Sequence, residues 1–203
     1  MTDTTIASLF STPIYISNIK RKFTIKELYL VKKSKENPVI NIGNINSRNS
    51  YVLEKKEFNN LKKELTEKVK EYFNKVLRAT DVEPYITQSW LNYTETNQFH
   101  HTHNHPNSLV SGVFYIDVDE EKDKIKFCKP GYQQLRLKVT DYNQWNSEHW
   151  WFPVSTGELF LFPSSLEHTV EHKKGSNTRI SLAFNVFVKG NLGDEEGLTE
   201  LKL

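Results

Sequence analysis

The sequence contains only one cysteine and one methionine among its 203 residues. A single cysteine, Cys128, excludes an internal disulfide and a cysteine-rich zinc site. A chain with so little cysteine is typical of the reducing cytosol, so we expect a cytoplasmic location.

Long apolar runs are missing too, and none approaches the roughly 20 residues that a membrane helix needs. Residues 1–9 lack the basic region and apolar stretch of a signal peptide. Neither sign of charge dominates: 27 Lys and Arg stand against 25 Asp and Glu, for a net charge of +2. Strong nonspecific nucleic-acid binding normally requires a basic excess. We therefore expect neither a membrane nor a nucleic acid as partner.

The length of the chain suits one domain with a sizeable core. We expect a single domain over residues 1–203, with a helical support region at 1–83, a β core at 84–188 and a tail at 189–203. In the support region, a first strand is expected at 8–19, interrupted by Pro13, and a loop at 41–50. Thr24 and Glu27 have the spacing of a capping box and predict a short helix to about residue 34.

The strongest helix is predicted at residues 55–77, because apolar residues recur there at steps of three and four. The apolar stripe consists of Phe58, Leu61, Leu65, Val69, Phe73 and Val76.

From residue 84 onward the apolar pattern has period two, which is typical of strands. Helices followed by many short antiparallel strands predict a mainly β fold with N-terminal helices, built on a double-stranded β-helix of the jelly-roll or cupin type. The expected strands lie near 86–93, 108–118, 124–128, 133–140, 157–162 and 178–188.

Four of the seven histidines lie within six residues, at positions 100, 101, 103 and 105. Neutral imidazole is the commonest protein ligand for a catalytic metal. In an extended chain, residues two apart point to the same face. We therefore expect His101, His103 and His105 on one side of a strand and His100 on the other.

The strand expected at 178–188 has one apolar face and one small, polar face that begins with an arginine. A small polar face is typical of a ligand cavity. An arginine that points inward needs a buried anion, which is either a ligand or an internal Asp or Glu. The apolar face carries Ile180, Leu182, Phe184, Val186 and Val188, and the polar face carries Arg179, Ser181, Ala183 and Asn185.

Four segments, in this order and at this spacing, resemble the Fe(II)/2-oxoglutarate-dependent oxygenases, and most closely an uncharacterised branch known from phages and marine bacteria. The resemblance covers roughly residues 84–188. It implies an oxidoreductase that uses Fe(II) as cofactor and 2-oxoglutarate as co-substrate, decarboxylates the co-substrate to succinate and hydroxylates a prime substrate. The segments are His103-Asn104-His105-Pro106, Ser111-Gly112-Val113-Phe114-Tyr115, Phe162-Pro163-Ser164-Ser165-Leu166-Glu167-His168 and Arg179-Ile180-Ser181.

The family usually holds iron with two histidines and one carboxylate, but His105 stands at the carboxylate position here. Three arrangements are open: a site of His103, His105 and His168; a two-histidine site completed by water; or a shifted pair, His101 and His103. The match to the family's His-x-His-Pro segment favours the first. His172 lies in a charged segment, and we interpret it as a surface residue.

The resemblance also implies that 2-oxoglutarate chelates the iron and that its distal carboxylate pairs with Arg179, whose planar fork suits a carboxylate. Ser181 adds a hydroxyl on the same face. Tyr115 and, more weakly, Asn92 are further candidates for binding the co-substrate, although a buried tyrosine can equally serve in packing.

Two other functions are considered. His101, His103 and His105 distantly resemble the His-x-His-x-Asp-His motif of metallo-β-lactamases, but no Asp precedes His105 and the strand pattern differs. A non-enzymatic, cupin-like protein that binds a metal or a small molecule would keep the barrel but would not need an inward Arg179. The Trp-containing segment 119–151 either covers the barrel mouth or packs a loop onto the sheet. The sequence does not specify the prime substrate, whether small molecule, amino acid or peptide, or the oligomeric state.

Overall fold

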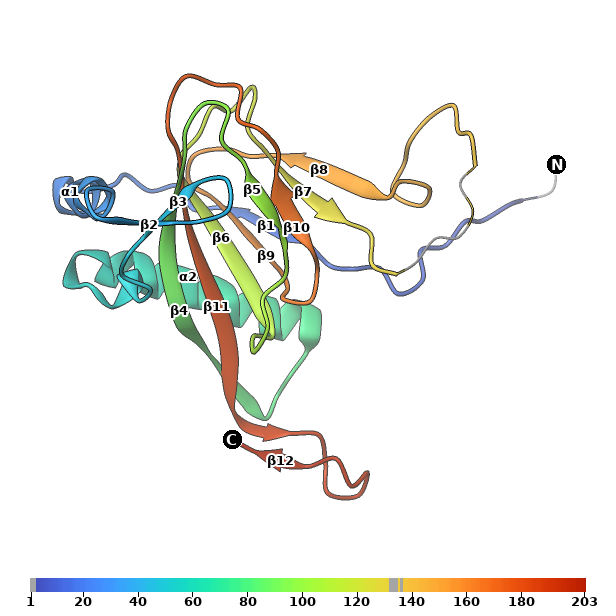
Figure 1. Ribbon diagram of the computed structural model, residues 1–203. Coiled ribbons are helices and arrows are strands. Elements are labelled where there is room, and N and C mark those ends of the chain that lie inside the picture. Colours follow the sequence, from blue (N-terminus) through green and yellow to red (C-terminus); the bar gives the residue numbers. More distant parts are fainter. Residues whose placement is uncertain (1–2, 132–134, 136) are drawn as a thin grey trace.

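The computed structural model describes residues 3–131, 135 and 137–203. In these residues the chain is mainly β, with two α-helices and two antiparallel sheets. Figure 1 shows three layers: the helices lie on one side of the larger sheet, and the smaller sheet lies on its other side. This layering leaves a space between the two sheets that neither helix reaches.

The larger sheet has eight strands, and its longest pair, β4 and β11, forms its centre. Along the sheet the order is β1-β9-β6-β11-β4-β3-β2, and β12 pairs with β11. The bounds are β1 Tyr15–Asn18, β2 Pro38–Ile40, β3 Ile45–Ser47, β4 Val82–Thr94, β6 Val110–Asp117, β9 Glu158–Pro163, β11 Arg179–Leu192 and β12 Leu201–Lys202.

The smaller sheet has the order β5-β10-β7-β8. Its strands come from the segments that lie between those of the larger sheet, so the chain crosses repeatedly from one sheet to the other. The bounds are β5 His100–His103, β7 Lys124–Cys128, β8 His149–Pro153 and β10 His168–Val170.

The capping box is confirmed at the start of α1, Ile25–Ser34, where the Thr24 hydroxyl accepts from the Glu27 backbone N–H and the Glu27 carboxylate accepts from the Thr24 N–H. The longer predicted helix is divided: α2 spans Asn59–Tyr72, a short 3₁₀ turn at Lys56–Phe58 precedes it, and a π-helical turn at Phe73–Leu77 ends it. A further 3₁₀ turn covers Val52–Glu54.

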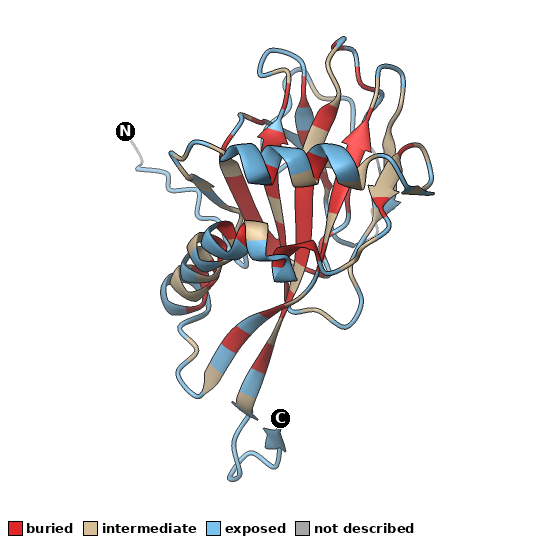
Figure 2. Cartoon of the chain, turned by 90° about the vertical axis from the view of Figure 1, so that its left-hand side faces the viewer, coloured by how far each residue is buried: buried red, intermediate tan, exposed pale blue. Residues whose placement is uncertain are grey.

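Two apolar clusters form the interior. The larger lies between the helices and the larger sheet and includes Leu61, Leu65, Leu182 and Phe184. The smaller lies between the sheets, around Tyr115 and Phe127 among others. Figure 2 shows the helices in front of the larger sheet, whose central strands are buried. One face of that sheet thus supplies stability, which leaves the other face available for a site.

The predicted faces of the last strand are confirmed. Leu182, Phe184, Val186 and Val188 are buried in the cluster beneath the helices, with Ile180 packed against it. Arg179, Ser181 and Ala183 point to the opposite side and line a pocket between the sheets. The alternation of a strand therefore separates packing residues from site residues.

Several expected boundaries are wrong. The first strand begins only at Tyr15, and the expected loop 41–50 contains β3, which pairs with β2. The strand expected at the histidine cluster is present as β5, but it ends at His103 and does not include His105. The strands β2, β8, β10 and β12 were not expected, because they are short and lack clean alternation. Part of the strand expected at 133–140 lies outside the described residues, and its described residues, 135 and 137–140, are not in a strand.

No helix in the described parts of the chain is both long and apolar enough to cross a membrane.

Candidate functional site

Three histidines meet on the inner side of the smaller sheet. His103 at the end of β5 pairs with His168 on β10, and their ring centroids lie 4.4 Å apart. His105 follows β5 in a turn that is fixed by a bond from its backbone N–H to the Ser164 carbonyl at 2.9 Å. One nitrogen from each ring lies within 4.8 Å of the others, so the three rings could hold a metal ion.

Backbone carbonyls orient two of these rings. His103 Nδ1 lies 2.8 Å from the His101 carbonyl oxygen, and His168 Nδ1 lies 3.2 Å from the Leu166 carbonyl oxygen. A carbonyl only accepts hydrogen bonds, so both Nδ1 atoms carry their protons. The Nε2 atom of each ring therefore keeps its lone pair for another partner. Such a bond behind the ring is the usual support of a metal-ligating histidine.

Burial also favours the neutral form of these rings. It lowers the pKa of His105 to about 4 and that of His168 well below its ordinary value. Burial likewise lowers the pKa of His103. Neutral imidazole is the form that binds metal, so the rings do not have to lose a proton near neutral pH.

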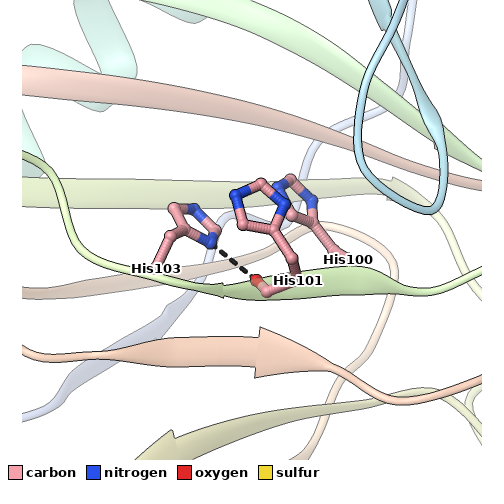
Figure 3. A group of neighbouring side chains, drawn as sticks. All are labelled: His100, His101 and His103. Atoms are coloured by element: carbon pink, nitrogen blue, oxygen red, sulfur yellow. Dashed lines mark hydrogen bonds between the residues drawn. The ribbon is translucent and has the colours of Figure 1, made fainter.

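His100 is not where the sequence predicted it. Between the pairs His168–His103 and Val170–His100, one residue of β10 lies opposite two residues of β5, which is a β-bulge. The additional residue turns His100 to the side of His103, and the two rings stack at 4.6 Å and 13°. Figure 3 shows the rings of His100, His101 and His103 rising from one side of β5. The expectation that His100 faces away is therefore wrong.

His100, His101 and His103 form a second group whose nitrogens lie within 4.8 Å. Two observations make this group the weaker metal candidate. The ring nitrogens of His100 face the amide nitrogens of Asn41 and Asn44 at 3.2 and 3.4 Å. His101 does not line the pocket between the sheets that includes His103, His105 and His168.

That pocket joins the histidines to Arg179. The Arg179 side chain, 3% exposed, donates from Nη1 to the Lys124 carbonyl at 2.8 Å and from Nη2 to the Tyr115 hydroxyl at 3.3 Å. Among the described residues, no Asp or Glu forms an ion pair with it. The pocket is lined by Trp90, Asn92, His100, His103, His105, Ser111, Gly112, Val113, Tyr115, Ile125, Phe162, His168, Thr169, Val170, Arg179, Ser181 and Ala183.

The remaining predicted residues are also in this pocket. Asn92 and Ser181 are register partners on β4 and β11, and Asn92 Nδ2 lies 3.5 Å from Ser181 Oγ. Asn92 Oδ1 is buried without a hydrogen-bond partner in the described chain. Tyr115 is fully buried, and burial raises its pKa to about 12, so it stays protonated and can donate. The pocket therefore offers several donors around one arginine.

Sequence reasoning missed Trp90 and His100. The Trp90 ring stacks on His105 at 5.6 Å and 23° and lines the pocket. Its position two residues before Asn92 on the same strand could have indicated this. His172 is exposed and packs against Phe99, as expected for a surface residue.

The tryptophans of the predicted covering segment lie elsewhere. Trp145, Trp150 and Trp151 are partly exposed and line a separate groove beside β8. None of them lines the histidine pocket. These three tryptophans therefore take no part in the histidine pocket.

Comparison with known proteins gives one family and one fold. Residues 88–185 match the family model described as "Putative 2OG-Fe(II) oxygenase". No curated protein matches the sequence.

Similar solved structures include HygX from Streptomyces hygroscopicus with nickel, 2-oxoglutarate and hygromycin B bound, at 11% identity and a TM-score of 0.60, covering 86% of this chain and 82% of that one. A viral collagen prolyl hydroxylase from Paramecium Bursaria Chlorella virus-1, in complex with 2-oxoglutarate, has 11% identity and a TM-score of 0.54 and covers 85% and 94%. A Pseudomonas putida prolyl-4-hydroxylase has 14% identity and a TM-score of 0.51 and covers 86% and 93%. At these identities the likeness establishes the fold.

Proposed function

Since the chain belongs to the 2OG-Fe(II) oxygenase family through residues 88–185, we propose that it is an Fe(II)- and 2-oxoglutarate-dependent dioxygenase that hydroxylates a prime substrate. The prime substrate is a small molecule, an amino acid or a peptide side chain. We further propose that residues 1–203 form one oxygenase domain. The cytoplasmic location stays a prediction.

The sheet orders support a double-stranded β-helix. Four strands, β5-β10-β7-β8, face the central four of the larger sheet, β9-β6-β11-β4. Consecutive strands of the core alternate between the two sheets from β4 to β7 and again from β8 to β11. This alternation is the winding expected of a jelly-roll core.

The donor set fits iron. We assign His103, His105 and His168 as metal ligands, because their rings converge, are neutral and lie in the same pocket as Arg179. Imidazole suits Fe(II), and three protein ligands leave coordination positions open for other groups. The shifted pair His101 and His103 is disfavoured, because His101 does not line the pocket.

The same pocket fits 2-oxoglutarate. We assign Arg179 to its distal carboxylate, because this buried cation has no carboxylate partner among the described residues. Tyr115 and Ser181 supply hydroxyls beside it. Rotating the Asn92 amide by half a turn would let Oδ1 accept from Ser181 and leave Nδ2 to donate to the co-substrate. Arg179, Ser181, Tyr115 and Asn92 are then the co-substrate residues.

When bound, Fe(II) and 2-oxoglutarate would supply the oxidising chemistry with dioxygen as the oxidant: one oxygen atom would enter succinate as 2-oxoglutarate loses CO₂, and the other would enter the prime substrate as its hydroxyl group. The protein residues bind and orient. Arg179 and the histidines line one pocket, and apolar side chains such as Ile125 and Phe162, which also line it, exclude water. Exclusion of water strengthens every charged contact inside the pocket.

The observation that carries the proposal is the three-histidine cluster in one pocket with an arginine that has no described acidic partner. Adding Fe(II) and 2-oxoglutarate without oxygen should give a visible charge-transfer band, which His103→Ala and His168→Ala should each abolish. His105→Ala distinguishes a three-histidine site from a two-histidine site with water, because only the latter keeps the band. A wild-type protein that binds iron and never shows the band would refute the proposal.

Succinate release separates the alternatives. A cupin-like binding protein would bind the metal but would not convert 2-oxoglutarate to succinate. The metallo-β-lactamase alternative is disfavoured, because Asn104 and not an Asp precedes His105 and the helices lie on one side of the larger sheet only.

A further inference from the structure

Asn185 lies on β11, on the pocket side of the strand and two residues after Ala183. Its register partner on β6 is Ser111, and β11 is irregular here, with a shift against β4 between Phe184 and Val186. Its Oδ1 atom is buried and has no hydrogen-bond partner in the described structure. A buried acceptor without a donor is unfavourable, so this oxygen needs an explanation.

The group next to this oxygen is the His105 ring. The His105 backbone N–H donates to the Ser164 carbonyl at 2.9 Å, and Ser164 Oγ lies 2.8 Å from Ser111 Oγ, on the residue opposite Asn185. The Asn185 side chain lies against the His105 ring. Trp90 stacks on the ring and limits its rotation.

The three candidate ligands differ in the hydrogen-bond acceptor available to the ring nitrogen that does not face the metal. His103 and His168 each have a backbone carbonyl at Nδ1, at 2.8 and 3.2 Å. His105 has no such carbonyl among the described hydrogen bonds. A carboxylate at this position, as the family usually has, would carry no N–H and would need no acceptor. An imidazole needs one if its other nitrogen is to face a metal.

We propose that Asn185 Oδ1 is the acceptor that orients His105, receiving the N–H of the ring nitrogen that does not face the metal. Asn185 is then a positioning residue, and it replaces for His105 the backbone carbonyl that His103 and His168 use. The inference rests on the proposed function, because it assumes that His105 is a ligand.

The test compares Asn185→Leu, which keeps the size but removes the acceptor, with Asn185→Asp, which keeps an acceptor. Ni(II) binding to the full chain, measured by calorimetry, should weaken about 10- to 100-fold in Asn185→Leu, the usual effect of losing such support. Asn185→Asp should bind within about threefold of wild type. Asn46→Leu is the matched control, because Asn46 Oδ1 is also buried without a described partner, but Asn46 lies on β3, which pairs with neither β6 nor β11.

A folded Asn185→Leu protein that binds Ni(II) as tightly as wild type would overturn the inference alone. A wild-type protein that binds no Ni(II) would overturn it together with the proposed function. If Asn185→Leu does not fold, ¹⁵N NMR of the histidine rings in Zn(II)-loaded wild type decides. One His105 nitrogen should be coordinated to Zn(II), and the other should carry a proton that exchanges slowly with solvent. In Asn185→Ser this proton should exchange rapidly. An unprotected proton on the wild-type ring would contradict the inference.

Discussion

The ring of His103 lies 4.4 Å from the ring of His168, on neighbouring antiparallel strands of the smaller sheet. Both rings are held from behind by a backbone carbonyl, so both present Nε2 to the same space. Two segments far apart in the sequence thus each supply one histidine to the same site.

His101→Ala should bind metal within a few-fold of wild type, whereas His103→Ala should lose it. The support for His103 comes from the backbone carbonyl of residue 101, which an alanine keeps. Calorimetric titration with Ni(II) measures both. Complete loss of metal in His101→Ala, with His105→Ala still binding, would show that the ligand set is shifted toward His100 and His101.

Arg179→Ala should weaken 2-oxoglutarate binding by about 2–5 kcal/mol, or roughly one and a half to three and a half decades of affinity. Arg179→Lys keeps the charge without the planar fork and should lie between this variant and wild type. Metal affinity should stay close to the wild-type value. Calorimetry with the metal present measures the effect, and Arg48→Ala, at an exposed arginine, is the control. Unchanged 2-oxoglutarate affinity in a folded Arg179→Ala protein would remove Arg179 from the site.

The metal-free protein should lose stability as the pH falls from about 6.5 to about 4. Burial lowers the pKa of His105 from 6.5 to about 4 and that of His100 from 6.5 to about 3. Within this window the unfolded chain takes up protons that the folded chain does not, so stability rises with pH. Each ring contributes on the order of 1–3 kcal/mol. Thermal unfolding across this range should show the slope, and His100→Asn should flatten it. A melting temperature that does not change with pH would contradict this.

Gly112→Ala should destabilise the fold by about 1–3 kcal/mol or more. A Cβ atom at this position would come within 2.1 Å of the Phe184 ring, which is fully buried beneath the helices. The melting temperature should fall by roughly 2–4 °C for each kcal/mol. In a Phe184→Leu background the clash is relieved, so Gly112→Ala should lower the melting temperature less there than it does in the wild-type background. Additive losses in the double variant would indicate a cause other than this clash.

Local signals in the sequence predicted much of the framework. The Thr24–Glu27 capping box and the apolar stripe of α2 act through neighbours three and four residues apart, so they can be recognised without the fold. The division of the last strand into a packing face and a pocket face follows from its alternation. The short strands β5 and β10 lack such alternation, and only pairing with each other and with β7 makes them strands.

By itself, the sequence determined the chemical types at the site: a histidine cluster, a distant histidine and an arginine on a small polar face. The tertiary structure decided which of them meet. A bulge in β5 turned His100 into the pocket, and the pairing of β11 with β6 placed Asn185 opposite Ser111. The physical reason is that one added residue in a strand reverses the direction of the side chains that follow, and this depends on a partner strand that is remote in sequence.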